Sequence, residues 1–176
     1  MGKIAIVCGT NRTDSVSREI TGIYASLLEA LDQEVEIIDL RKLPSDFTTS
    51  ALYENSGKNE EFNQFREIMA ETKKFVFIVP EYNGSFPGVL KAFIDGLKFP
   101  QTFTDKKCAL VGVSSGVQGA GLALSHLTDI FNYCGTNVLA LKPKLAQIDN
   151  HLKDGKITND LYNTLLKDQA KKLVAF

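Results

Sequence analysis

The stretch that most constrains the fold is segment 75–97, which reads FVFIVPEYNGSFPGVLKAFIDGL. It begins with five consecutive apolar residues, 75–79, a run typical of a strand buried on both faces of a parallel sheet. It ends with apolar residues one helical turn apart, which predict a helix over 89–97. In open α/β sheets, ligands bind where strands end and helices begin. The polar loop 80–87 is therefore the first candidate for a functional site.

Two features of this loop suggest its local structure. Pro87 suits the first turn of the following helix, and Ser85 is predicted to be its N-cap. The tip, Tyr82-Asn83-Gly84, lies between two prolines and is more elaborate than an ordinary β–α turn requires, although such a turn remains the simplest alternative.

The same alternation of strand and helix runs through the chain and predicts a single α/β domain over residues 1–176, a three-layer, doubly wound parallel sheet. The polar segment 44–58 is predicted to be a surface excursion, and Gly135 to end a helix. The predicted strands cover 4–8, 35–40, 75–79, 108–113 and 138–141. The predicted helices cover 20–31, 60–73, 89–97, 123–131 and 161–173.

Charge and composition exclude several classes of protein. A formal net charge of −1 gives no reason to expect nucleic acid or an anionic membrane surface as a partner. The longest apolar runs have the length of strands, and no signal peptide is recognisable. The three cysteines form no CxxC pair, which favours reduced thiols and a cytoplasmic protein.

The loop after the first predicted strand, residues 9–17, has the composition of an anion site. It is rich in hydroxyl groups and leads into a helix, whose first N–H groups and positive dipole end attract anions. Arg12 would add a charge-assisted contact to a phosphate. The alternative is that Ser15 or Ser17 serves only as an N-cap and Arg12 is solvated. The GK[ST] of a P-loop and the GxGxxG of a dinucleotide site are absent from this loop.

A third loop of this kind, SSGVQGAG over 114–121, follows the strand 108–113. Its glycines allow a ligand to approach the backbone, and its N–H groups and the next helix N-terminus could face developing negative charge. The alternative is a tight turn. No Ser-His-Asp, paired-carboxylate or metal-ligand pattern is apparent, so we predict no catalytic side chain and no metal. His126 is interpreted as a boundary residue of a helix, and His151 is given no role.

These three loops resemble the motifs of one family, the NAD(P)H-dependent FMN reductases. GTNRTDSVS resembles the family's phosphate loop GSxRxxSxN, and PEYNGSFPGVLKAFIDGL resembles PEYNxSxPGxLKNAIDxL. SSGVQGAG resembles SxGxxGGxRA. The motifs occur in the family's order, and the middle one is specific. One departure concerns the arginine of the last motif, because the chain has Leu122 at that position.

The resemblance implies a flavodoxin-like fold, with strand order 2-1-3-4-5 and FMN at the switch point between the first and third strands. It further implies hydride transfer from NADPH or NADH, a small-molecule electron acceptor, and a homodimer or homotetramer. The phosphate would be held by Thr10, Arg12, Ser15, Val16 and Ser17. The flavin ring would be lined, largely through backbone groups, by Pro80, Glu81, Tyr82, Asn83 and Gly84. Its pyrimidine edge would face Ser114, Ser115, Gly116 and Gly119.

Two other functions stay open at this level. A flavodoxin would carry single electrons between protein partners, but the phosphate loop lacks the T/S-x-T-G-x-T pattern of flavodoxins. A flavodoxin-like domain that has lost FMN would serve only in binding or assembly, and Leu122 is compatible with that function.

Overall fold

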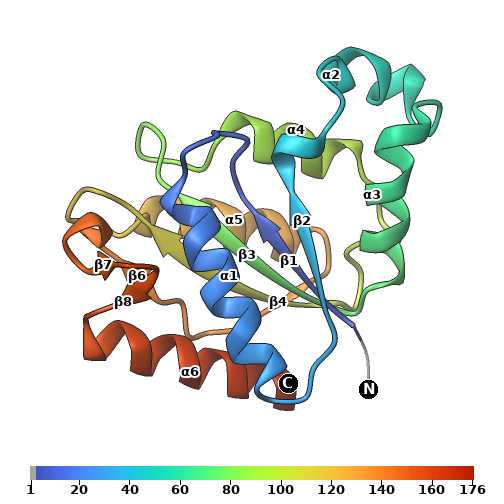
Figure 1. Ribbon diagram of the computed structural model, residues 1–176. Coiled ribbons are helices and arrows are strands. Elements are labelled where there is room, and N and C mark those ends of the chain that lie inside the picture. Colours follow the sequence, from blue (N-terminus) through green and yellow to red (C-terminus); the bar gives the residue numbers. More distant parts are fainter. Residues whose placement is uncertain (1–2) are drawn as a thin grey trace.

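The computed structural model describes residues 3–176 and is built around a six-stranded parallel sheet, shown in Figure 1. The strand order β2-β1-β3-β4-β5 is the predicted one, with β6 as an additional strand beside β4. The three central strands consist almost wholly of buried apolar residues, which explains why they were recognisable as continuous apolar runs. The strands are β1 Ile4–Cys8, β2 Val35–Asp39, β3 Lys74–Pro80, β4 Lys107–Val113, β5 Asn137–Val138 and β6 Lys144–Leu145.

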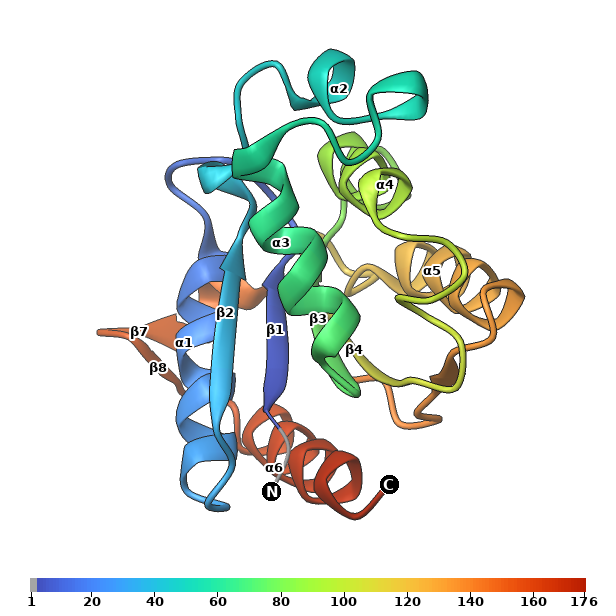
Figure 2. The same ribbon diagram turned by 90° about the vertical axis from the view of Figure 1, so that its right-hand side faces the viewer.

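Helices cover both faces of the sheet, and Figure 2 shows the three layers in profile. One face packs against α1 Val16–Glu29 and α6 Asp160–Ala175. The other packs against α3 Glu60–Glu71, α4 Gly88–Gly96 and α5 Gly121–Tyr133. Within residues 3–176, no helix has the length and apolar character needed to cross a membrane.

The predicted fifth strand, 138–141, is wrong in its extent. Pairing with β4 stops at Val138 and resumes only at Lys144, so two short strands share one neighbour. Gln169 of α6, which is fully buried, fills the gap: its amide donates to Leu110 O at 2.9 Å and to Leu141 O at 2.7 Å. A side chain thus satisfies carbonyl groups that a continuous strand would have bonded.

Segment 44–58 is more ordered than a polar surface excursion. It contains α2 Phe47–Ser50 and the single-turn helix η2 Tyr53–Asn55. A second single-turn helix, η1 Leu40–Lys42, comes just before it. Phe47 stacks on Phe62 of α3, with ring centroids 5.6 Å apart, and Leu52 is also buried. The segment has few apolar residues, which is why its sequence predicts a loop. Those few residues nevertheless anchor it to the core.

The two remaining predictions about helix ends have different outcomes. Gly135 does end α5: its φ is 82°, its N–H donates to Asn132 O, and the next N–H, of Thr136, donates to Phe131 O. Ser85 is not the N-cap of α4, because that position belongs to Pro87. After β6 the chain forms η3 Ile148–Asn150 and a hairpin of β7 Leu152–Lys153 and β8 Lys156–Ile157.

Candidate cofactor site

The loops that follow β1, β3 and β4 meet at the carboxyl edge of the sheet (Figure 1) and enclose a pocket of about 230 Å³. Parallel strands bring these loops together because their carboxyl ends lie at the same edge. The segment after β6 closes the pocket from a fourth direction. The lining consists of Arg12, Ser15, Val16, Ser17, Pro80, Glu81, Tyr82, Val113, Ser114, Ser115, Ile148 and Asp149.

Nine of the predicted cofactor residues line this pocket and five do not. Those in the lining are Arg12, Ser15, Val16, Ser17, Pro80, Glu81, Tyr82, Ser114 and Ser115. Those outside it are Thr10, Asn83, Gly84, Gly116 and Gly119. The five make local contacts within their own loops, and the part of each predicted residue in cofactor binding remains a prediction.

The loop between β1 and α1 keeps its hydrogen-bond donors available. Among the hydrogen bonds of residues 3–176, none uses the backbone N–H groups of residues 13–17. Ser15 is the N-cap of α1, but its hydroxyl makes no capping bond. Arg12 is exposed beside them, and its Nε donates to Asp14 O at 3.1 Å. Unpaired donors at a helix N-terminus, next to a guanidinium, have the chemistry of an anion site.

Arg18 stabilises this loop through hydrogen bonds to its carbonyl groups, a role that the sequence did not predict. Its guanidinium donates to the carbonyl oxygens of Arg12, at 3.0 Å, and of Thr13. Its Nε also lies 3.5 Å from Asp39 Oδ2 at the end of β2. The only sequence signal was a cation in the first turn of a helix, where a charge of that sign is unfavourable to the dipole and needs another reason.

Asp39 is the anion that fixes this arrangement. It accepts from the backbone N–H of Arg41 at 3.0 Å and from that guanidinium at 2.5 Å. Burial on its own would raise the pKa of Asp39, but hydrogen bonds from Arg41 and the charges of Arg41 and Arg18 outweigh burial and lower it. The carboxylate is therefore held ionised, with a cation on either side.

The tip of the loop after β3 is a tight turn. Tyr82 and Ser85 exchange backbone hydrogen bonds of 2.8 and 3.0 Å, and Asn83 and Gly84 between them have φ values of 51° and 74°. Two successive positive φ angles define a type I′ turn, for which Asn-Gly is a preferred sequence. Asn83 and Gly84 thus shape the turn without lining the pocket.

Tyr82 connects this turn to the first loop. Its hydroxyl lies within hydrogen-bonding distance, 2.9 Å, of Thr10 Oγ1. The same Thr10 oxygen accepts from the N–H of Arg12 at 3.2 Å. Thr10 is only 1% exposed. Its hydroxyl therefore links Tyr82 to the backbone at Arg12, and Thr10 is not part of the pocket lining.

The loop after β4 differs from the first loop, because its last donors are already bonded. Ser114 Oγ accepts from the N–H of Gly119 at 2.9 Å and donates to Gly116 O at 2.8 Å. The carboxylate of Glu81 accepts from the N–H of Ala120, the N-cap of α5, at 3.0 Å. We expected this helix N-terminus to face negative charge on a ligand, and instead it faces Glu81. Within residues 3–176, the N–H groups of residues 115–118 make no hydrogen bond.

Sequence reasoning also missed the fourth wall of the pocket. The N–H of Ile148 donates to Ser114 O at 3.1 Å and that of Gln147 to Gly116 O at 2.9 Å, which places Ile148 and Asp149 in the lining. No motif marks these residues. They reach the pocket because the edge strand is interrupted and resumes as β6.

Neither histidine lies in the pocket lining. His126 of α5 is exposed, and its Nδ1 lies 2.9 Å from Ser85 Oγ. His151 packs edge-on against the ring of Tyr162. Both have local structural contacts.

A doubly wound sheet with an anion loop after its first strand is the architecture of a flavodoxin-like protein. The model of the NADPH-dependent FMN reductase family matches residues 2–146, so the chain belongs to that family. The predicted enzyme class, an FMN-dependent NAD(P)H oxidoreductase, is thereby confirmed.

Curated relatives carry related names. A 2-hydroxy-1,4-benzoquinone reductase of Burkholderia sp is 28% identical over 176 residues, which are 97% of this chain and 88% of that protein. An NAD(P)H:quinone oxidoreductase of Solanum tuberosum is 31% identical over 131 residues, 73% of this chain and 66% of the relative.

Solved structures agree on the fold. A flavoenzyme NAD(P)H:(acceptor) oxidoreductase of Paracoccus denitrificans has a TM-score of 0.79 at 24% identity, over 99% of this chain and 96% of that one. An FMN-dependent NADH-azoreductase of Bacillus anthracis, solved with FMN, has a TM-score of 0.67 at 15% identity, over 97% and 99% of the two chains.

Proposed function

We propose that the protein takes a hydride from NADPH or NADH with a resident FMN and passes the electrons to a quinone or a similar small acceptor, such as a free flavin, an azo compound or a metal ion. The observation that carries this proposal is the pocket itself, with a free anion loop at one side and a wall of small residues at the other. The names of the relatives, among them quinone reductases, support the acceptor class.

The anion loop fits the phosphate of FMN. Its unbonded N–H groups at 13–17, the free hydroxyl of Ser15 and the exposed guanidinium of Arg12 would donate to phosphate oxygens. Arg18 would not contact the phosphate, because its guanidinium is already committed to carbonyl groups and Asp39. Its role would be to hold the loop in the receptive conformation.

The rest of the pocket would hold the ring. When bound, FMN supplies the redox chemistry, accepting a hydride and giving up its electrons. Tyr82, fixed by Thr10, would cover one side, and the backbone at 115–116 would offer donors to the polar edge. No side chain is assigned the transfer of a proton.

NAD(P)H and the acceptor would use the same open side of the pocket in turn, which predicts ping-pong kinetics. The test is steady-state oxidation of NADPH and of NADH, with FMN supplied, across a panel of quinone, azo, metal and flavin acceptors. Parallel lines in double-reciprocal plots are expected. Intersecting lines would require both substrates to bind together and would contradict the shared site.

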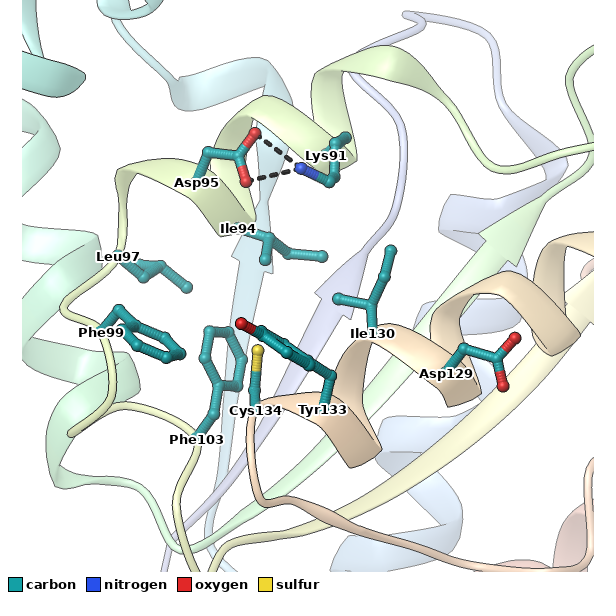
Figure 3. Close-up of a pocket in the computed structure, with 10 residues that line it drawn as sticks. All are labelled: Lys91, Ile94, Asp95, Leu97, Phe99, Phe103, Asp129, Ile130, Tyr133 and Cys134. Carbon is teal, nitrogen blue, oxygen red and sulfur yellow. Dashed lines mark hydrogen bonds and ion pairs between the residues drawn. The ribbon is translucent and has the colours of Figure 1, made fainter.

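A homodimer or homotetramer formed through α4 and α5 is also part of the proposal. A larger hollow, of about 460 Å³, lies along the later turns of these helices, and Figure 3 shows apolar side chains converging on it. Tyr133 is 85% exposed and Phe99 64% exposed at its rim. The hollow does not resemble a phosphate site, because its one lysine, Lys91, is paired with Asp95 at 2.7 Å. A contact with a second subunit would cover these apolar groups.

Light scattering at micromolar concentration tests the assembly. We expect the mass of a dimer or tetramer, and Tyr133→Glu should shift it toward the monomer by burying a charge in the contact. A monomeric wild-type protein would contradict this part of the proposal, and Leu122, which is exposed where the family has arginine, would be the first residue to examine. A cytoplasmic location is proposed because all three cysteines are free thiols.

A further inference from the structure

Glu81 joins two walls of the pocket. Its backbone N–H donates to Val113 O at the end of β4, at 3.0 Å. Its carboxylate accepts from the N–H of Ala120 at 3.0 Å, across from β3 to the start of α5. Glu81 also lines the pocket and is only partly buried. A single residue thus ties the loops together, and its carboxylate belongs to a residue of the pocket lining.

The N–H group that Glu81 binds, that of Ala120, lies at the positive end of a helix dipole. Ala120 is fully buried, has a left-handed φ of 61°, and caps the 13-residue helix α5. The positive end of a helix stabilises an anion that lies against its first N–H groups. The Glu81 carboxylate already occupies that position and offsets the positive end of α5. The side of the pocket near this helix end is therefore not a site of positive potential.

Charges are distributed unevenly around the pocket. The cation in the lining, Arg12, belongs to the anion loop, whereas Glu81 and Asp149 lie on the other walls. If the phosphate binds at the anion loop, the walls that carry the carboxylates would be left to hold the ring of the cofactor. In the reductive half-reaction NAD(P)H loses a hydride to become NAD(P)⁺, and FMN gains two electrons and one proton, so one negative charge is added to the ring.

Building on the function proposed above, we propose that Glu81 sets the reduction potential of the bound FMN. Its charge opposes the negative charge of the reduced ring, and its bond to Ala120 fixes the position of the carboxylate. The bound cofactor is therefore a stronger reductant than it would be beside a neutral residue, which suits the delivery of electrons to a quinone-type acceptor.

Glu81→Gln separates the charge from the structural tie. The amide oxygen of glutamine can still accept from Ala120, so the link between the loops is kept while the charge is removed. The measurement is the two-electron potential of bound FMN by anaerobic titration against a reference dye. We expect a positive shift of about 30 mV or more, equal to a tenfold gain in the preference for reduced over oxidised FMN.

Asp149→Asn is the matched control. It removes the same charge from the same pocket, but Asp149 is exposed and, in the described part of the chain, makes no hydrogen bond to α5. Solvent should therefore screen it, and its shift should be less than half as large. An unchanged potential in Glu81→Gln, or an equal shift in Asp149→Asn, would overturn the inference.

A purely structural role has a different signature. If Glu81 only tied the loops, Glu81→Gln would behave as wild type and Glu81→Ala alone would lose thermal stability, which would also overturn the inference. If the wild-type protein bound no FMN at all, the proposed function would fail together with it. Bound FMN with an unshifted potential would overturn the role of Glu81 alone.

Discussion

The loops that follow β1 and β4 differ in whether the N–H groups nearest the next helix are bonded. Among the described residues, 3–176, nothing accepts from the five consecutive N–H groups of residues 13–17, and Arg18 bonds to carbonyl groups of the same loop. In the loop 114–120, Ser114 and Glu81 accept the last two N–H groups, and the segment at 147–148 bonds to its carbonyl groups. The first loop is therefore a receptor for an anion at the helix N-terminus. The second is a wall anchored by Ser114, Glu81 and segment 147–148, and within residues 3–176 only its N–H groups at 115–118 stay unbonded.

The largest expected effect on stability comes from a substitution that pushes the loop after β4 away from its strand. A Cβ added at Gly112 would meet the carbonyl oxygen of Gly119 at 2.2 Å and Leu124 Cδ1 at 3.0 Å. Gly112→Ala should therefore lower the free energy of unfolding by about 3 kcal/mol, measured by urea denaturation. Gly116→Ala lies in the loop that follows β4. Apart from its chain neighbours, nothing is within 4 Å of its new Cβ, so it should cost less than about 0.5 kcal/mol. Equal losses would mean that the wall is not tightly closed.

Removing the cation of the receptor loop should have the next largest effect. Arg12→Ala would lose a charge-assisted contact of about 1.5–3 kcal/mol, weakening FMN by about one to two orders of magnitude in a fluorescence titration. Riboflavin, which lacks the phosphate, serves as the control ligand and should bind both proteins with similar affinity. An unchanged FMN affinity would count against the phosphate role of Arg12.

Asp39 tests whether the receptor loop depends on its support. The folded state lowers the pKa of Asp39, so its stabilising contribution is present at neutral pH and is lost as the pH falls through that lowered value. Asp39→Asn should lower the free energy of unfolding by about 1 kcal/mol at neutral pH. The gap to wild type should begin to narrow below the ordinary aspartate pKa of about 3.9 and be gone below the lowered pKa of the folded state. A gap that persists in stronger acid would show that the charge is not its cause.

The smallest effects are expected from the groups that could have been proton donors. Tyr82→Phe and His126→Ala should each reduce kcat by less than about tenfold, or 1.4 kcal/mol of barrier, because neither side chain is needed to move a proton. The measurement is steady-state turnover with saturating FMN. A loss of several orders of magnitude in either variant, with FMN still bound, would show that the mechanism uses that side chain.

Much of the fold could be predicted because its central strands are buried on both faces and read as uninterrupted apolar runs. The interrupted edge strand could not be foreseen, since it depends on Gln169, which lies 59 residues beyond its partner Leu110. Ser85 looked like an N-cap only because the Asn-Gly tip was not recognised as a type I′ turn.

The candidate site likewise contains residues that local sequence predicts and residues that only distant pairing places there. Residues within motifs, such as Arg12 and Tyr82, could be found because their residue type and position carry the chemistry. Asp149 could not, because it reaches the pocket only through the pairing of β6 with β4. The pairing of Glu81 with Ala120 likewise joins two loops 39 residues apart, and no local pattern reports it.

The most direct test of the account is to mix the FMN-loaded protein with NADPH or NADH in the absence of oxygen and of any acceptor. We predict that an equimolar amount of reduced nicotinamide bleaches the flavin absorbance in a two-electron step, and that a quinone added afterwards restores it. A flavin that stays oxidised in the presence of both nucleotides, while bound in the pocket, would contradict the claim that this chain is an NAD(P)H-dependent reductase.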